Sequence, residues 1–310
     1  MKLKITLLAF LLCGIGFLQA QINEVDKVES SLTMDIVDTI PNGWRFGGVT
    51  SLNFSQLYLS NWAAGGLSSI SLNGLGSAFA SYKKGSFIWD NTLDVGYGFV
   101  RQPEDKIKFK KTDDRFELNS KVGYKAFSNF YYSGLVNFKT QFDKGYDYKA
   151  EPAADGSLPN ISDFLAPAYL TAALGLSYQP NDYFNVLLAP VTGRMTIVTV
   201  DSLRPVFSVD PDKSTRTEFG GYVRAVFSKN DFKPAWLRNI TLTSKLDLFT
   251  NYLEEPNIDV NWEVLIAMKI NRFLSVNIST HLIYDEDIIL PDEGKVQFKE
   301  LLGVGLSYNF

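Results

Sequence analysis

The sequence predicts an all-β fold, a transmembrane antiparallel up-and-down β-barrel of about 12 strands. Three features of the chain predict it. Apolar and polar residues alternate through long segments, short and long connections alternate between those segments, and the last segment ends on an aromatic residue, Phe310. Alternation with a period of two is typical of a strand whose two faces meet different surroundings.

Residues 1–20 resemble a secretory signal peptide. Lys2 and Lys4 precede an apolar run over residues 5–18, and Ala20 is a suitable last residue before cleavage. The run is shorter than the ~20 residues that a spanning helix needs. A lipoprotein signal that uses Cys13 is disfavoured, because Leu12 stands where a small residue is required. We therefore expect export and cleavage.

The composition excludes several classes of function. The single cysteine, Cys13, lies in the predicted signal peptide, which excludes disulfides, thiolate catalysis and cysteine metal sites from the mature chain. The formal net charge is −4 with both signs scattered, which argues against a nucleic-acid partner. No phosphate-binding loop, dinucleotide fingerprint or zinc spacing is present, so we expect no cofactor.

After the signal peptide, residues 21–43 lack strand periodicity and are expected to form a flexible periplasmic lead, with a plug inside the barrel as the alternative. Residues 44–310 are expected to form the barrel. The predicted strands are 44–56, 67–82, 86–100, 114–126, 130–142, 166–179, 183–195, 215–228, 238–251, 258–270, 273–284 and 297–310. Each exceeds the ~9–11 residues that a tilted strand needs to cross the hydrocarbon, and their number is even, as in bacterial single-chain barrels.

The alternation is clearest in segments 86–100, 114–126 and 258–270. There the aromatic and aliphatic residues occupy one set of alternate positions, or parity, and the charged residues occupy the other. It is poorest in segments 67–82 and 183–195, whose boundaries are therefore the least certain predictions. A soluble β-sandwich would also alternate, but 12 strands this long exceed the ~5–6 residues usual there. The parity therefore favours a membrane barrel.

The connections support the same fold independently. If both chain ends lie in the periplasm, the connections after even-numbered strands are periplasmic and should be short. Four of these five are short, and the exception, residues 229–237, contains Pro234. Most of the others are longer and carry proline or acidic clusters.

The last strand carries a predicted membrane-sorting signal. Tyr308 and Phe310 lie on its apolar parity, and a terminal aromatic on this face resembles the signal read by the machinery that inserts outer-membrane barrels. We expect an outer-membrane location, with membrane lipid and this insertion machinery as partners. Phe310 is expected on the periplasmic side.

The first hairpin and the strand after it carry a family resemblance. The residues are Trp44, Gly47-Gly48, Asn53-Phe54-Ser55-Gln56, Ser60-Asn61-Trp62-Ala63-Ala64-Gly65-Gly66, Trp89-Asp90-Asn91 and Gly96-Tyr97-Gly98. They resemble a family of Bacteroidota proteins known as a domain of unknown function and regarded as outer-membrane barrels. The resemblance implies location and fold, and it brings no catalytic residues.

The opposite parity of the strands collects charged residues that we expect to line the lumen. They are Asp90, Asp94, Arg115, Glu117, Lys121, Arg224, Lys245, Asp247, Glu263, Lys269 and His281. Opposed charges can line a selective, porin-like path, or they can pair and fill the interior of a closed barrel. A 12-stranded barrel lies between small filled barrels and open porins of ~16–18 strands, and we favour a narrow or occluded channel.

Three functions remain open. The first is a narrow passive channel for a small polar solute, and the second is a structural or docking barrel that binds a partner through its outer loops or its lead. The third is lipid hydrolysis by Ser279 and His281, which share a strand face at the spacing of outer-membrane phospholipases. Those enzymes work on the lipid-facing side, whereas this parity faces the lumen, so we expect no enzyme. The acidic clusters at 210–212 and 285–287 lack the spacing of a calcium loop.

Overall fold

The computed structural model describes residues 41–58, 68–102, 109–148, 150–230, 232–253, 257–271, 274–288 and 296–309. The predicted signal peptide, nearly all of the predicted lead, Phe310 and the side chain of Tyr308 lie outside this description. No helix in the described part of the chain is long and apolar enough to cross a membrane.

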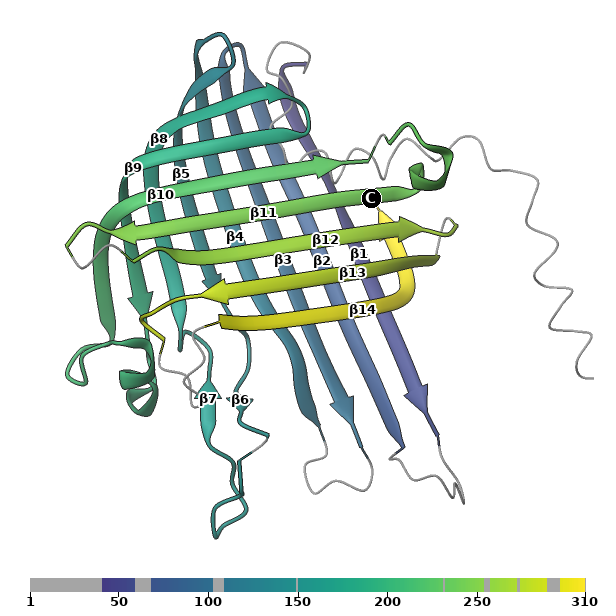
Figure 1. Cartoon of the computed structure of the whole chain (residues 1–310), viewed down its shortest axis with the longest axis vertical. Helices are drawn as coiled ribbons and strands as arrows, with labels where there is room; N and C mark the ends of the chain where they lie inside the picture. The colour runs from purple at the N-terminus through teal and green to yellow at the C-terminus, as the bar shows by residue number, and fades with distance from the viewer. Residues whose placement is uncertain are drawn as a thin grey trace, which may run out of the picture.

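The described strands form one closed antiparallel barrel of 12 strands (Figure 1). They are β1 (Gly43–Leu57), β2 (Ser69–Lys84), β3 (Phe87–Arg101), β4 (Lys110–Phe127), β5 (Phe130–Thr140), β8 (Ala168–Asn181), β9 (Phe184–Ile197), β10 (Thr215–Lys229), β11 (Ile240–Asn251), β12 (Asp259–Lys269), β13 (Leu274–Tyr284) and β14 (Val296–Asn309). Each pairs with its neighbours in the chain, and β14 pairs with β1 to close the barrel. The predicted fold class and strand number are confirmed.

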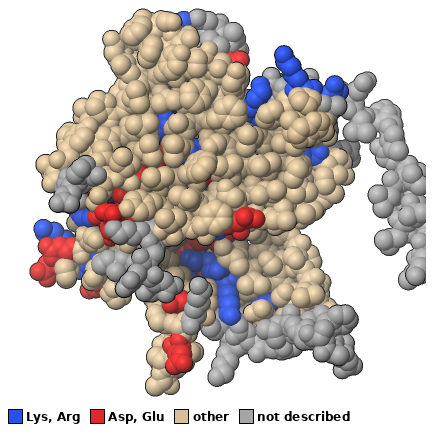
Figure 2. All heavy atoms as spheres, viewed as in Figure 1, with Lys and Arg blue, Asp and Glu red and all other residues tan. Residues whose placement is uncertain are grey.

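The wall is apolar outside and mainly polar inside, the reverse of a soluble domain, although one apolar cluster that includes Leu135 and Leu187 is also buried in the interior. On β4, Leu118 and Tyr124 are 42% and 58% exposed, whereas Glu117 and Asn119 on the other parity are 2% and 7% exposed. Charged side chains gather mainly at the ends of the barrel, and the wall between them is largely uncharged on the face in Figure 2. An exposed apolar wall around a polar interior is what a bilayer selects.

Aromatic side chains cluster outside the barrel at both ends of the strands. One set pairs rings where β1 begins and β2 ends, with Trp44 and Tyr82 5.1 Å apart between ring centroids. A second set lies at the opposite end, where Phe219 and Tyr252 are 5.9 Å apart. Two such girdles are typical of the two membrane–water interfaces.

The two ends of the barrel differ in their connections. At one end, which we call the turn end, strands join through short turns such as the one at Gly85, whose φ of +57° suits glycine. The one long turn-end connection, between β10 and β11, carries a short 3-10 helix, η3 (Ala235–Leu237). The asymmetry matches the predicted pattern of connections.

The opposite, loop end carries most of the long connections. A two-stranded sheet of β6 (Gly145–Tyr146) and β7 (Asn160–Ser162) projects there beyond the barrel (Figure 1). The β9–β10 connection contains two 3-10 helices, η1 (Asp201–Leu203) and η2 (Pro205–Phe207). Apolar residues of this connection pack with Ala166 of the β7–β8 connection in a small core: Ala166, Val198, Leu203, Phe207 and Val209.

A bulge interrupts the wall at Pro190. The β8–β9 register passes from Leu174 opposite Val191 to Leu176 opposite Leu188, so β9 contains one extra residue at this level. Before the bulge the odd-numbered residues of β9, such as Leu187, face the interior of the barrel. After it the even-numbered residues, such as Arg194, do so. This reversal explains the poor alternation of segment 183–195, which is nevertheless a strand. Segment 67–82 also forms a strand, shifted by two residues to β2.

Candidate lumenal site

The residues predicted to line the lumen occupy the strand positions opposite to the exposed apolar ones. They come from six strands, with Asp90 and Asp94 on β3, Arg115, Glu117 and Lys121 on β4, Arg224 on β10, Lys245 and Asp247 on β11, Glu263 and Lys269 on β12, and His281 on β13. Most of them meet in one network near the middle of the strands. Asp90, Lys121 and Lys269 lie outside it.

This central network contains four carboxylates and four basic side chains. They are Glu117, Asp94, Asp247 and Glu263, with Arg115, Lys139, Lys245 and Arg224. Equal numbers of the two signs leave the network neutral. That balance allows the charged side chains to remain buried in the interior of the barrel, where an unpaired charge would destabilise the fold.

Glu117 on β4 binds more side chains than any other carboxylate of the network. Its carboxylate accepts hydrogen bonds from Arg115 Nη2 at 2.5 Å, Asn137 Nδ2 at 2.9 Å and Asn119 Nδ2 at 3.1 Å. Lys139 Nζ lies 3.6 Å from the same carboxylate. With a side chain only 3% exposed, Glu117 depends on these donors instead of water.

Several contacts of the network join strands that are not neighbours in the wall. Arg115 Nη1 on β4 lies 2.9 Å from Glu263 Oε2 on β12. Lys245 Nζ on β11 lies 3.3 Å from Asp94 Oδ2 on β3. These ion pairs cross the lumen, so the barrel is bridged at mid-height by side chains.

A cavity of about 370 Å³ lies beside the network. Its lining follows β12 from Asn261 to Lys269 and β13 from Ser275 to His281. Eight residues of strand rise by roughly 27 Å, so the cavity extends along most of these two strands. The structure thus combines a bridged lumen with a polar space along one wall.

His281 and Ser279 both line this cavity. His281 Nε2 lies 2.9 Å from Asn261 Oδ1 and 3.7 Å from Glu263 Oε1. Because the ring nitrogen contacts these two side chains inside the barrel, the histidine is placed away from the lipid-facing surface. This geometry supports a structural role for the His281 ring.

Two predicted residues, Asp90 on β3 and Lys121 on β4, lie opposite each other in the strand register, nearer the turn end than the central network. Lys121 Nζ donates to Asn185 Oδ1 at 2.8 Å, which joins β4 to β9. Asp90 on β3 accepts a hydrogen bond from the hydroxyl of Ser81 on β2. These contacts place polar groups on the wall without adding to the central network.

A second charged cluster at the loop end was missed by the sequence analysis. Arg194 on β9 donates to both oxygens of Glu218 at 2.9 Å, and it lies 2.5 Å from Asp259 and 3.3 Å from Asp287. Its guanidinium also stacks over Phe249, 4.1 Å from the ring centroid. The nearby bulge at Pro190 was the signal that could have revealed its inward direction.

The Arg194 cluster attaches the β13–β14 connection to the barrel mouth. Asp287 also accepts a hydrogen bond from Arg216, and its backbone carbonyl accepts one from Ser208 Oγ at 2.6 Å. Burial by itself raises the pKa of Asp287, but hydrogen bonding and charge from Arg216 outweigh it and hold the pKa below its ordinary value. Burial raises the pKa of the neighbouring Asp285.

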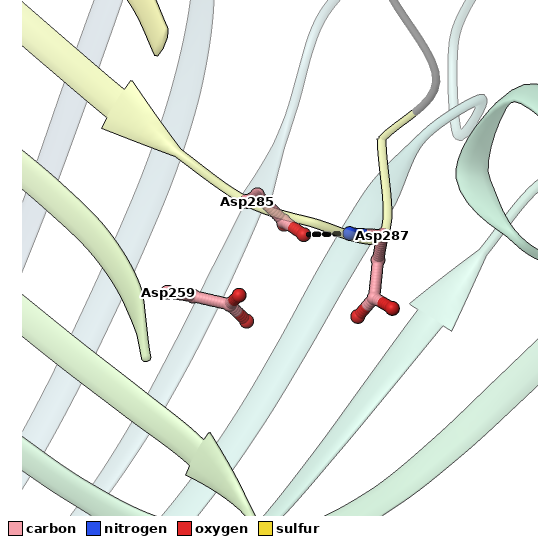
Figure 3. Close-up of side chains that lie close together, drawn as sticks. All are labelled: Asp259, Asp285 and Asp287. Atoms are coloured by element: carbon pink, nitrogen blue, oxygen red, sulfur yellow. Dashed lines mark hydrogen bonds between the residues drawn. The ribbon is translucent and has the colours of Figure 1, made fainter. Parts of the chain in front are cut away.

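Three carboxylates come together in this cluster (Figure 3). Oxygen atoms of Asp259, Asp285 and Asp287 lie within 4.8 Å of one another, and Asp285 accepts the backbone N–H of Asp287 at 2.9 Å. Arg194 and Arg216 already supply positive charge to the group. The geometry therefore supports an ion-pair attachment of the loop.

Comparisons with known proteins agree with the family resemblance. Residues 54–146 match the model of a family described as a protein of unknown function, DUF3078. No curated protein matches the sequence.

Among solved structures, similar chains are barrels. The translocator domain of autotransporter NalP from Neisseria meningitidis has a TM-score of 0.41 and 10% identity, covering 88% of this chain and 91% of that one. An outer-membrane channel from Pseudomonas putida F1 has a TM-score of 0.38 and 11% identity, covering 87% and 96%. Outer-membrane phospholipase A from Escherichia coli has a TM-score of 0.39 and 12% identity, covering 89% and 97%.

Proposed function

We propose that the protein is an outer-membrane barrel that provides a narrow passive path for small polar solutes. The observation that carries the proposal is the cavity along β12 and β13, whose lining consists mainly of polar and charged residues. A barrel built only for support would gain from filling this space, because an unfilled polar volume leaves hydrogen-bonding groups without protein partners. The exposed apolar wall and its two aromatic girdles support the membrane location.

The turn end is proposed to face the periplasm, since short connections are periplasmic in bacterial barrels. Solutes would then enter between the long loops and pass beside the central network. The cavity is much narrower than the lumen of an open porin, because Arg115 and Glu263 cross the barrel next to it. Small conductance is therefore the expected behaviour.

The test is single-channel recording of the purified protein in a planar bilayer. We expect small stepwise conductance, and a larger step for the double variant Arg115→Ala/Glu263→Ala, which removes a crossing ion pair without changing the net charge. The matched control is Lys213→Ala/Asp210→Ala, an exposed loop pair 3.6 Å apart. Silent recordings from both the natural protein and the crossing-pair variant would refute the channel.

A second candidate, a docking barrel, is favoured by the structure of the described loop-end connections. The β6–β7 sheet projects from the barrel, and the β9–β10 loop shares an apolar core with the β7–β8 connection. For this candidate we expect crosslinking on intact cells to yield one outer-membrane or surface partner, and deletion of residues 150–159 to abolish it. A crosslinking pattern that is unchanged by the deletion would count against docking through this sheet.

A further inference from the structure

The basic residues lining the cavity differ in whether their charge is compensated. Four of the five have a carboxylate within 4 Å: Arg115 with Glu117 and Glu263, Lys139 with Glu117 and Asp247, Lys245 with Asp94, and Lys299 with Asp113. The fifth, Lys269, has no hydrogen-bond or ion-pair partner for its ammonium group in the described part of the chain. The cavity therefore contains one uncompensated positive charge, at its turn end.

Neutral donors lie beside Lys269 on the same face of the wall. Ser275 is directly opposite it in the β12–β13 register, and Asn277 and Ser279 follow on the lumen-facing parity of β13. Ser275 is 7% exposed, and its Oγ is buried without a hydrogen-bond partner among the described residues. Burying a hydroxyl without a hydrogen-bond partner destabilises the fold unless a ligand or water satisfies it.

The wall around these donors is built from small residues. Ala267 lies opposite Asn277 on β12, and Gly303 and Gly305 lie opposite Asn277 and Ser275 on β14. Ala267 leaves the donors of β13 uncovered on the β12 side, whereas the side chain of Asn53 fills the space above the two glycines on the β14 side. The arrangement leaves room for a ligand of a few heavy atoms beside the lysine.

The local charge limits the class of that ligand. The nearest carboxylate on the same strand is Glu263, six residues and about 20 Å of strand from Lys269, and Arg115 already pairs with it. One ammonium surrounded by hydroxyl and amide donors matches a single negative charge spread over two oxygen atoms. Inorganic phosphate, with close to two charges near neutral pH, would be left partly uncompensated.

We infer that the turn-end half of the cavity binds a small monocarboxylate through Lys269, Ser275 and Asn277. The inference rests on the proposed function, since a solute on the path is what would occupy the cavity. Lys269 supplies the charge, and the hydroxyl of Ser275 and the amide of Asn277 donate hydrogen bonds to the carboxylate oxygens. The path would then favour small carboxylates over neutral or cationic solutes of the same size.

The test is ligand-detected NMR with acetate on the purified barrel in deuterated detergent. We expect saturation transfer to the acetate methyl group from the natural protein and at least a tenfold weaker apparent affinity for Lys269→Met. The control is Lys233→Met, the same change at an exposed turn-end position outside the barrel. Ser275→Ala, which removes only the orphaned hydroxyl, should weaken binding severalfold and tests the site with less risk to folding.

Absence of acetate binding would overturn the inference, and so would three further results. They are equal binding of acetate by the natural protein and Lys269→Met, binding of neutral acetamide as tight as that of acetate, and full displacement of acetate by an equal concentration of inorganic phosphate. A barrel that conducts but binds no acetate refutes the site and leaves the channel intact. A barrel that shows no conductance but binds acetate refutes the proposed channel and leaves the binding site intact.

Discussion

Glu117→Gln should destabilise the barrel strongly. The substitution keeps the size of the side chain but leaves three carboxylates facing four basic side chains in the central network. Glu117 is 2% exposed, so water cannot replace the lost charge at the guanidinium of Arg115, 2.5 Å away. Breaking a buried ion pair by removing one partner costs about 3–5 kcal/mol, which lowers the folding equilibrium constant by roughly 10²–10⁴.

The measurement is urea unfolding of the barrel in lipid vesicles, followed by tryptophan fluorescence at several denaturant concentrations. The control is Glu151→Gln, the same change in an exposed loop residue, which should alter the unfolding free energy by less than about 0.5 kcal/mol. If Glu117→Gln and Glu151→Gln unfold at the same midpoint, the central network is hydrated and the reasoning from burial fails.

Three further outcomes are expected. Gly175→Ala should destabilise the barrel by ~1–3 kcal/mol or more, because the added Cβ would lie 1.9 Å from the carbonyl oxygen of Leu188. The check is gel migration: if the variant has lost the barrel, its unheated and boiled samples should migrate alike. The lowered pKa of Asp287 means that its contact with Arg216 stabilises the loop fully above the unfolded carboxyl pKa of ~3.9. This stabilisation is lost only as the pH falls through the still lower folded value. Hydrogen exchange of residues 284–288, corrected for intrinsic rates, should therefore show protection at pH 5 that is lost only at a pH below ~3.9, and loss already at pH 5 would contradict the prediction. Neither the natural protein nor His281→Ala should hydrolyse phospholipid vesicles above background. Hydrolysis by the natural protein that is lost in His281→Ala would contradict a purely structural role for this side chain.

The strand number could be predicted because lipid and lumen place different demands on alternate residues of every strand. That contrast is local, so each segment could be assigned from its own sequence. The contacts across the lumen could not be predicted in this way. Which residue of β12 meets Arg115 depends on the stagger of strands far apart in the chain, and no local pattern encodes that stagger.

Arg194 shows the second reason for an incomplete prediction. Alternate positions predict which side chains face inward only while a strand contains no extra residue. The bulge at Pro190 shifts the inward-facing positions of β9 from odd to even residue numbers. Proline and glycine in a strand are recognisable signs of such a break. They show that the parity is unreliable there, but the direction of the change still depends on the neighbouring strands.

The closing pair of strands has a consequence for how the barrel assembles. The β1–β14 ladder registers 5 residue pairs, against 15 for β1–β2, and it is the shortest of the 12 ladders in the described barrel. It also joins the segments that are farthest apart in the chain, so its formation carries the largest loss of chain entropy. Eleven ladders can therefore accumulate between sequential neighbours before the last one forms. We expect this late step to set the folding rate, and the same seam to be the first to separate when the barrel unfolds.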